Sequence, residues 1–241
     1  MELPVLYQDE HIVAVNKPAG MLVHRSKIEK RVFVFALQTL RNQLGRHVYP
    51  VHRLDRPTSG ILLFSLSLQA AADLCEQFEK RTVRKIYEAV VRGHIMEGGT
   101  RDEPLREKHD RKSDKRARHC KESQQAITGF EPLKHWTIPL SAGKYEHSRY
   151  SLVRIEPKTG RKHQIRRHFN HMSHPVIGDS TYGDRRHNRL FREQLGIVRL
   201  LLHARHLHIT HPVTGNALSI EAGYGTEFEA AVQKLNEHDV E

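Results

Sequence analysis

The feature that most constrains the fold is an apolar run from Ile61 to Leu66, bounded by Gly60 and Ser67. A short run of this kind between turn residues is typical of a strand buried on both faces. The apolar residues that follow are spaced as on one face of a helix: Leu68, Ala71, Leu74, Cys75 and Phe78. The sequence therefore predicts a buried strand followed directly by a helix.

The remaining pattern mixes strands and helices without regular strand–helix–strand alternation. We predict two strands over Leu6 to Asn16 with a turn at 8–10, and strands over Lys85 to Arg92, 148–156, Leu200 to Ile209 and Leu218 to Glu221. We predict helices over 32–44 with Gly45 as the C-cap, after 160 with the stripe Ile165, Phe169 and Met172, and near the C-terminus with Phe228, Val232 and Leu235. This order favours an α+β fold with a largely antiparallel sheet.

One segment has a different composition. Residues 101–121 contain nine Lys or Arg, five Asp or Glu and almost no large apolar side chain. Such a segment cannot form its own core. We interpret it as a charged, solvated insertion within one domain spanning residues 1–241, and we expect proteolysis to begin there, next to Lys112 or Arg118.

The charge of the chain favours a polyanionic partner. The 39 Lys and Arg residues against 28 Asp and Glu give a formal charge of +11. Each phosphate that a basic side chain neutralises releases counterions, which favours binding to nucleic acid. Two cysteines do not suggest a disulfide framework, and we identify no membrane span or signal peptide, so we expect a cytoplasmic protein.

The sharpest candidate site is the segment from His52 to Gly60, which precedes the buried strand and contains one carboxylate, Asp55. The flanking Arg53 and Arg56 would favour its ionised form. A structural ion pair in a loop would have the same composition.

A second basic segment runs from Lys158 to His168, with five Lys or Arg and no acid. Arg166 lies about 100° around a helix from Ile165, so it can face a cleft while Ile165 faces the core. A solvated basic helix face is the alternative interpretation.

Together these segments resemble the RluA family of pseudouridine synthases. The resemblance lies in HRLD with TSG at 52–60, KPAG at 17–20, KIY at 85–87, TGRKHQIR at 159–166, HPVIGD at 174–179, and LHA with a later HP at 202–212. These segments follow the family order and span roughly residues 5 to 222. The resemblance implies a pseudouridine synthase fold, with a mixed, largely antiparallel sheet, flanking helices and a central active-site cleft. It also implies an isomerase that needs no cofactor.

The resemblance also implies roles for single residues. Asp55 would be the catalytic carboxylate, Arg166 its partner, and Tyr87 the residue that stacks on the flipped base and takes part in proton transfer. Arg53 would enter the space that the flipped base leaves. A core tyrosine and a surface arginine are the alternatives for Tyr87 and Arg53.

The match is closer to members that modify tRNA at position 65, so tRNA is the expected partner. The first catalytic-domain strand begins within about ten residues of Met1, so we expect no N-terminal RNA-binding accessory domain, and we expect a monomer. The residues that we expect to contact RNA are His52, Arg53, Arg56, Lys17, Lys158, Arg161, Lys162 and Arg167.

Three alternatives were weighed. The 19 histidines invite a metal site, but His163, His168, His171 and His174 contain no i, i+4 pair, and we expect no metal. A non-catalytic RNA-binding module would not need Asp55, Tyr87 and Arg166 together. A synthase of the same family that modifies ribosomal RNA stays open from sequence.

Overall fold

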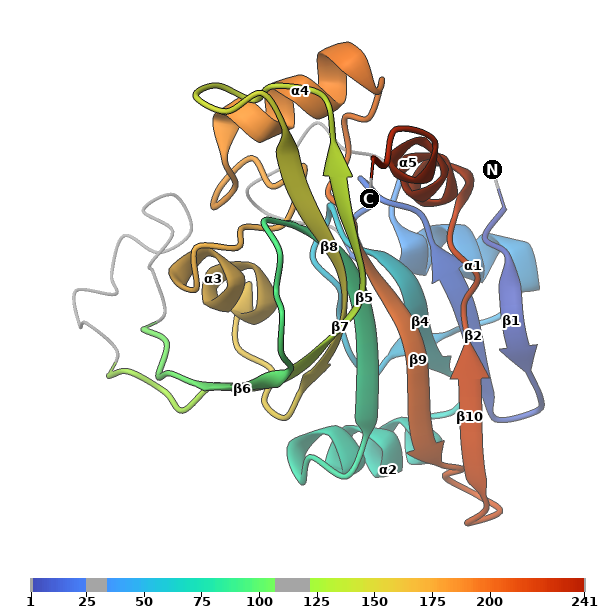
Figure 1. Ribbon diagram of the computed structural model, residues 1–241. Helices are drawn as coiled ribbons and strands as arrows, with labels where there is room; N and C mark the ends of the chain where they lie inside the picture. Colours follow the sequence, from blue (N-terminus) through green and yellow to red (C-terminus); the bar gives the residue numbers. More distant parts are fainter. Residues whose placement is uncertain (1, 25–33, 107–121, 241) are drawn as a thin grey trace, which may run out of the picture.

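A ten-stranded sheet forms the centre of the molecule (Figure 1). The computed structural model describes residues 2–24, 34–106 and 122–240. The strands are β1 (Val5–Gln8), β2 (Ile12–Lys17), β3 (Tyr49–Pro50), β4 (Ser59–Ser65), β5 (Arg84–Arg92), β6 (Gly99–Asp102), β7 (Ile127–Ile138), β8 (Ser148–Pro157), β9 (Leu202–Thr210) and β10 (Ala217–Glu221). The helices are α1 (Ala36–Leu44), α2 (Leu68–Glu79), α3 (Gln164–His171), α4 (Arg185–Gln194) and α5 (Thr226–Glu237).

The sheet order is β1-β2-β4-β9-β5-β8-β7-β6, with β10 added to β9 and β3 added to β4. All pairings are antiparallel except the short contact between β4 and β9, where Ser59 lies opposite His203 and Gly60 opposite Ala204. The predicted α+β class with a largely antiparallel sheet is therefore confirmed.

Helices cover both faces of the sheet. At the β2–β4 end, α1 packs on the face that carries Val13 and Leu62, and α2 packs on the face that carries Ala14 and Leu63. At the β5–β8 end, α4 and α5 cover one face and α3 covers the other. Alternate residues of each strand thus enter different cores, as the period of two requires.

The buried run was predicted correctly, because every residue of β4 is buried. The helix after it also forms, with the Ser67 hydroxyl accepting a hydrogen bond from the Ala70 amide at 3.2 Å. Leu68 was wrongly placed on the buried face. It is 70% exposed, whereas Leu74 of the predicted stripe is buried and Ala71, Cys75 and Phe78 pack against the same core.

The boundaries of the proposed insertion need correction. Residues 107–121, with Lys112 and Arg118, lie outside the described residues, but 101–106 are part of the fold. Arg101 and Asp102 belong to β6, which pairs with β7. Leu105 is only 2% exposed and exchanges backbone hydrogen bonds with Gln124. One apolar side chain and a strand partner are enough to anchor this stretch.

Four elements were not predicted: β3, β6, β7 and α4. The alternation along β7 is interrupted near Pro132, where its register against β8 shifts. Helix α4 is mostly charged, and only Leu190 and Phe191 are buried on it.

Candidate active site

The loop that carries Asp55 is fixed by backbone contacts at the start of β4. The Thr58 amide donates to the Asp55 carbonyl at 3.1 Å, and the Gly20 amide donates to the Arg56 carbonyl at 2.9 Å. In return, Arg56 Nε donates to the Gly20 carbonyl at 2.9 Å. These bonds hold the 52–60 loop against the turn after β2, and they leave the Asp55 side chain 22% exposed.

Lys17, which the sequence predicts to contact RNA, lies beneath this loop. Its side chain is fully buried, and Nζ donates to the carbonyls of Pro18 and Met21 at 2.9 Å and of Arg56 at 3.2 Å. Burial, with help from nearby Arg199 and against the effect of Asp55, lowers the pKa of Lys17 to about 7. Three carbonyl acceptors use all three hydrogens of the ammonium group. Lys17 is therefore a support for the loop.

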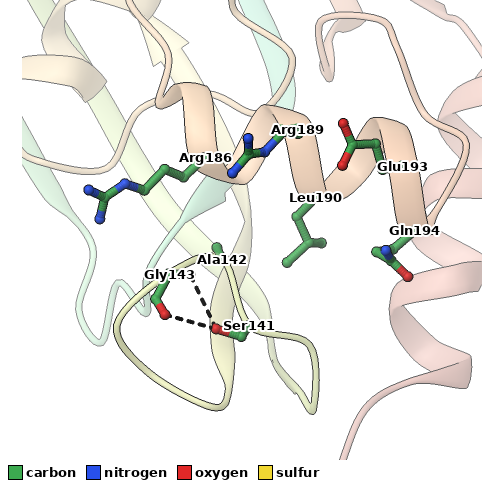
Figure 2. Close-up of a pocket in the computed structure, with 8 residues that line it drawn as sticks. All are labelled: Ser141, Ala142, Gly143, Arg186, Arg189, Leu190, Glu193 and Gln194. Carbon is green, nitrogen blue, oxygen red and sulfur yellow. Dashed lines mark hydrogen bonds between the residues drawn. The ribbon is translucent and has the colours of Figure 1, made fainter.

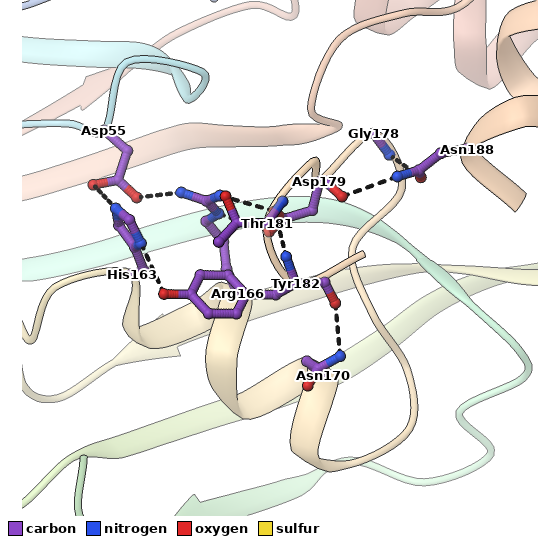
Figure 3. A network of polar contacts seen from close by, with 9 residues as sticks. All are labelled: Asp55, His163, Arg166, Asn170, Gly178, Asp179, Thr181, Tyr182 and Asn188. Atoms are coloured by element: carbon purple, nitrogen blue, oxygen red, sulfur yellow. Dashed lines mark hydrogen bonds and ion pairs between the residues drawn. The ribbon is translucent and has the colours of Figure 1, made fainter. Parts of the chain in front are cut away.

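Arg166 joins the Asp55 loop to helix α3. Its Nη1 lies 3.2 Å from Asp55 Oδ2, and its Nε and Nη2 donate to the two carboxylate oxygens of Asp179 at 2.7 and 2.8 Å (Figure 3). Arg166 is only 4% exposed. A forked pair of this kind fixes the guanidinium plane, so the remaining nitrogen is aimed at Asp55.

Asp179 is itself held in place. It is 2% exposed, and its Oδ1 also accepts the amides of Thr181 at 2.8 Å and Tyr182 at 3.0 Å. Burial alone would raise the pKa of Asp179, but the bonds from Arg166 and the two amides outweigh it and lower the pKa. The sequence reading used Asp179 only as a family marker and missed this role, although its place in the HPVIGD segment was the available signal.

His163 and Tyr182 were also missed as members of the site. His163 Nε2 lies 3.8 Å from Asp55 Oδ1, and its Nδ1 lies 3.1 Å from the Tyr182 hydroxyl (Figure 3). His163 precedes α3 with a left-handed φ of 56°, a conformation that turns its ring toward Asp55. Burial lowers the pKa of His163 more than Asp55 raises it. A neutral imidazole is therefore favoured beside the carboxylate at neutral pH.

Tyr87 reaches the same region from β5. Its ring packs with the core under α3, and the residue lies opposite Ile155 of β8 and Ala204 of β9. The pKa of the Tyr87 hydroxyl is raised, mainly by burial and secondly by the negative charge of Asp55. The predicted trio of Asp55, Tyr87 and Arg166 is thus brought together by three separate elements.

The other predicted RNA contacts divide by exposure. Arg53, Arg56, Lys158 and Lys162 are exposed, although Lys158 forms an ion pair with Glu156. Arg161 is half-buried and donates through Nε to the Gln125 carbonyl at 3.0 Å. These five side chains lie on the loops that also carry Asp55 and lead into α3.

Arg167 and His52 have structural contacts instead. Arg167 is 8% exposed and donates to the Arg106 carbonyl at 3.0 Å, so little of its side chain is open to a phosphate. His52 Nε2 accepts the Leu63 amide at 2.9 Å, and its ring stacks on Phe78 at 4.9 Å. Burial and the charge of Lys85 lower the pKa of His52 to about 3. A neutral imidazole bonded to β4 anchors the loop and carries no charge for a phosphate.

Among residues 2–24, 34–106 and 122–240, no group of three or more His, Cys, Asp or Glu side chains is arranged to hold a metal ion. In the same ranges, no helix is long and apolar enough to span a membrane.

Comparison with known proteins agrees with this geometry. A family model described as RNA pseudouridylate synthase matches residues 11–171. A protein from Yersinia pestis named tRNA pseudouridine synthase C is 52% identical over 233 residues, which cover 97% of this chain and 91% of that protein. The chain belongs to the RNA pseudouridylate synthase family. This pseudouridine synthase is therefore an isomerase.

Further relatives of the synthase support the assignment. The tRNA pseudouridine synthase C of Vibrio cholerae serotype O1 is 52% identical over 221 residues, 92% of this chain and 91% of that protein. The solved structure of human RNA pseudouridylate synthase domain containing 4 matches with a TM-score of 0.73 and 25% identity, over 97% of this chain and 93% of that one. Human RNA pseudouridylate synthase domain containing 1 matches with a TM-score of 0.72 and 26% identity, over 100% and 97%.

Proposed function

We propose that this synthase isomerises uridine to pseudouridine in tRNA, at position 65. Relatives about half identical over nearly the whole chain are named tRNA pseudouridine synthase C, and the motifs at 55–60, 156–168 and 178–180 resemble the tRNA-65 members. The observation that carries the catalytic part of the proposal is the contact between Asp55 and the buried Arg166. One ten-stranded sheet runs through residues 5–221, which supports a single catalytic domain.

The reaction rearranges bonds within one nucleotide. The bond between uracil N1 and ribose C1′ breaks, the base turns, and a bond between C5 and C1′ forms. C5 then loses its proton and N1 gains one, so no external group or redox partner is consumed. Two roles are open to Asp55: attack on the ribose or base as a nucleophile, and proton transfer as a base. Both need an ionised carboxylate.

Arg166 is suited to orient Asp55. Its Nη1 lies 3.2 Å from Asp55 Oδ2. The fork to Asp179 prevents Arg166 from turning away when substrate enters, because two of its nitrogens are already committed. Arg166 therefore positions the reactive carboxylate, and Asp179 positions Arg166.

The target base must leave its helix before Asp55 can reach it. Extruding a base costs a few kcal/mol of stacking and pairing energy. Arg53 is exposed two residues before Asp55, so it is placed to enter the vacated stack. The loops that carry Asp55 and lead into α3 also carry four other cations that would bind phosphates of the flanking strand: Arg56, Lys158, Arg161 and Lys162.

The Asp55→Asn variant tests the catalytic assignment. The substitution keeps the shape of the side chain but removes its charge, so both roles open to Asp55 are lost. We expect the variant to fold, to bind tRNA with similar or slightly higher affinity, and to turn over at least about a thousandfold more slowly, equivalent to ~4 kcal/mol. Arg166 keeps Asp179 as a partner, which protects the fold.

The measurements are a melting curve, a tRNA titration and a pseudouridine assay on one preparation. Asp73→Asn, on helix α2, is the matched control and should behave as wild type. Substantial turnover by a well-folded Asp55→Asn protein would remove Asp55 from the mechanism.

The substrate is tested separately. Pseudouridine is mapped in total RNA from cells with and without the gene. Loss of the modification at position 65 of tRNA supports the proposal, whereas loss confined to ribosomal RNA would contradict it and favour the ribosomal alternative.

A further inference from the structure

Helix α4 presents a row of arginines beside the active site. Arg185, Arg189 and Arg192 follow at intervals of four and three residues, so they lie along one face of the helix, with Arg186 next to them. All four side chains are exposed. The opposite face carries Leu190 and Phe191, which are buried in the core with α5. The helix is thus anchored by its apolar side and basic on its outer side.

This arginine face, Arg185, Arg186, Arg189 and Arg192, has few acidic neighbours. Among the described residues, Arg192 pairs with the adjacent Glu193 at 3.2 Å, and no ion pair there involves the other three. An exposed pair of this kind contributes little and is easily exchanged. Most of the charge is therefore available to an anionic partner.

The face lines a cavity of about 700 Å³ that continues to the loop of the catalytic network. Gly178, Asp179, Ser180 and Thr181 form the other wall of this cavity. Among the described residues that line it, Asp179 is the only carboxylate, and it is paired with Arg166. A second hollow, of about 360 Å³, lies on the other side of Arg186 and Arg189 (Figure 2). Figure 2 shows these two side chains projecting from α4 beside the turn at 141–143.

A short chain of contacts links the face to Asp55. Arg166 contacts both Asp55 and Asp179, and the Asp179 carbonyl accepts Asn188 Nδ2 of α4 at 2.9 Å (Figure 3). The Asn188 Oδ1 accepts the Gly178 amide at 2.8 Å. The arginine face is therefore held in a fixed position relative to the reacting carboxylate.

We propose that the arginine face of α4 binds backbone phosphates of the RNA next to the flipped nucleotide. Guanidinium groups suit phosphate because their planar forks can donate two hydrogen bonds to it. Phosphate contacts fix the register of a nucleic acid without reading its sequence. By binding these phosphates, the arginine face fixes the position of the RNA helix. It thereby determines which nucleotide reaches Asp55. This inference rests on the proposed RNA-modifying function and deepens it.

The test compares two double variants that remove the same charge. Arg185→Gln/Arg189→Gln removes two arginines of the face. Lys80→Gln/Arg81→Gln removes two exposed cations after α2, at the opposite end of the molecule from α4 (Figure 1). The dissociation constant for tRNA is measured for each between 50 and 200 mM salt, together with pseudouridine formation.

We expect the α4 variant to bind tRNA roughly tenfold more weakly and to lose about two units from the slope of log affinity against log salt. The control should keep both values near wild type. Equal affinity and slope in the two variants would overturn the inference. That result is also expected if the face binds an acidic protein and not RNA.

A conservative variant separates lost charge from a damaged helix. Arg185→Lys/Arg189→Lys keeps both charges, so its salt slope should stay near that of wild type while its affinity falls moderately. A slope that falls as far as in the Gln variant would contradict phosphate binding. Failure of the proposed function would be seen differently, as wild-type protein that binds tRNA but forms no pseudouridine.

Discussion

At the scale of single residues, Arg166 forms ion pairs with two carboxylates that have different roles. Asp179 is buried and accepts two hydrogen bonds from Arg166, whereas Asp55 is partly exposed and accepts one. The buried pair fixes geometry, and the exposed carboxylate is left accessible for chemistry. This division predicts opposite consequences for the two Asp→Asn substitutions.

Asp179→Asn should destabilise the protein, whereas Asp55→Asn should not. The substitution leaves the buried Arg166 with only its single contact to the partly exposed Asp55, and losing one partner of a buried pair costs about 3 kcal/mol or more. Denaturant unfolding measures this free energy directly. We also expect slow turnover well below the melting temperature, because Arg166 would no longer be aimed at Asp55. A free energy of unfolding within 1 kcal/mol of wild type would show that the fork is dispensable.

Tyr87→Phe should bind tRNA normally but turn over poorly. Phe keeps the ring for stacking and removes only the hydroxyl. Because burial and Asp55 raise the pKa of Tyr87, the hydroxyl is protonated in the free enzyme, and it can take up the C5 proton only by passing its own proton on. Turnover is compared on tRNA carrying protium or deuterium at C5. Near-normal rates with no change in isotope effect would make Tyr87 a packing residue.

At the scale of elements, the contact between β4 and β9 is unusually tight. Gly60 has a φ of 109°, and a Cβ added there would lie 2.3 Å from the Ala204 carbonyl oxygen. The neighbouring Ser59 hydroxyl accepts Arg199 Nη2 at 2.6 Å and lies 2.8 Å from His203 Nδ1. Because His203 Nε2 donates to the Ala222 carbonyl at 3.3 Å, Nδ1 of the neutral ring is free to accept the Ser59 hydroxyl. Protonation of Nδ1 would remove this acceptor, so the network favours a neutral His203.

This network predicts loss of stability in acid. Burial lowers the pKa of His203 to about 4, against the opposing effect of the backbone hydrogen bond at Ala222 and with smaller help from Arg199 and Arg205. The unfolded chain takes up this proton below its ordinary pKa of 6.5, while the folded chain resists until about 4. The free energy of unfolding should therefore fall as pH drops from 6.5 to 4, by up to about 1.4 kcal/mol per pH unit from this group.

The measurement is denaturant unfolding of wild type and His203→Gln at pH 7 and pH 5. The variant should be less stable at pH 7 but should lose less between the two values. Parallel losses in both proteins would assign the acid sensitivity to other groups, such as His52.

Sequence predicted the elements whose apolar pattern is regular, and it failed where the pattern is interrupted or sparse. The run in β4 and the stripe of α3 are recognisable without a structure, whereas β7 and α4 are not. In the site, family resemblance supplied Asp55, Tyr87 and Arg166. Lys17 and Arg167 were expected at the surface because they are charged, and only the tertiary structure shows that they are buried and donate to backbone carbonyls.

At the scale of the whole molecule, the charge of +11 is spread over regions with different functions. Some of it is buried, as at Lys17 and Arg166, and supports the active site. The remainder includes the exposed cations around Asp55 and the arginine face of α4. Only exposed cations can replace counterions on RNA, so net charge overstates the number of phosphates bound.

Binding of tRNA should nevertheless depend strongly on salt. Each phosphate that is neutralised contributes about −0.9 to the slope of log affinity against log salt on a duplex, and about −0.7 on a single strand. With cations at the Asp55 entrance and along α4 both engaged, we expect a slope of about −3 or steeper between 50 and 200 mM. The Asp55→Asn protein is used so that no substrate is consumed during the titration. The Asp55→Asn substitution is present at every salt concentration. The slope of log affinity against log salt therefore still measures how many phosphates the basic side chains neutralise. An affinity unchanged across this range would mean that shape and base contacts dominate, and that neither basic surface binds the backbone.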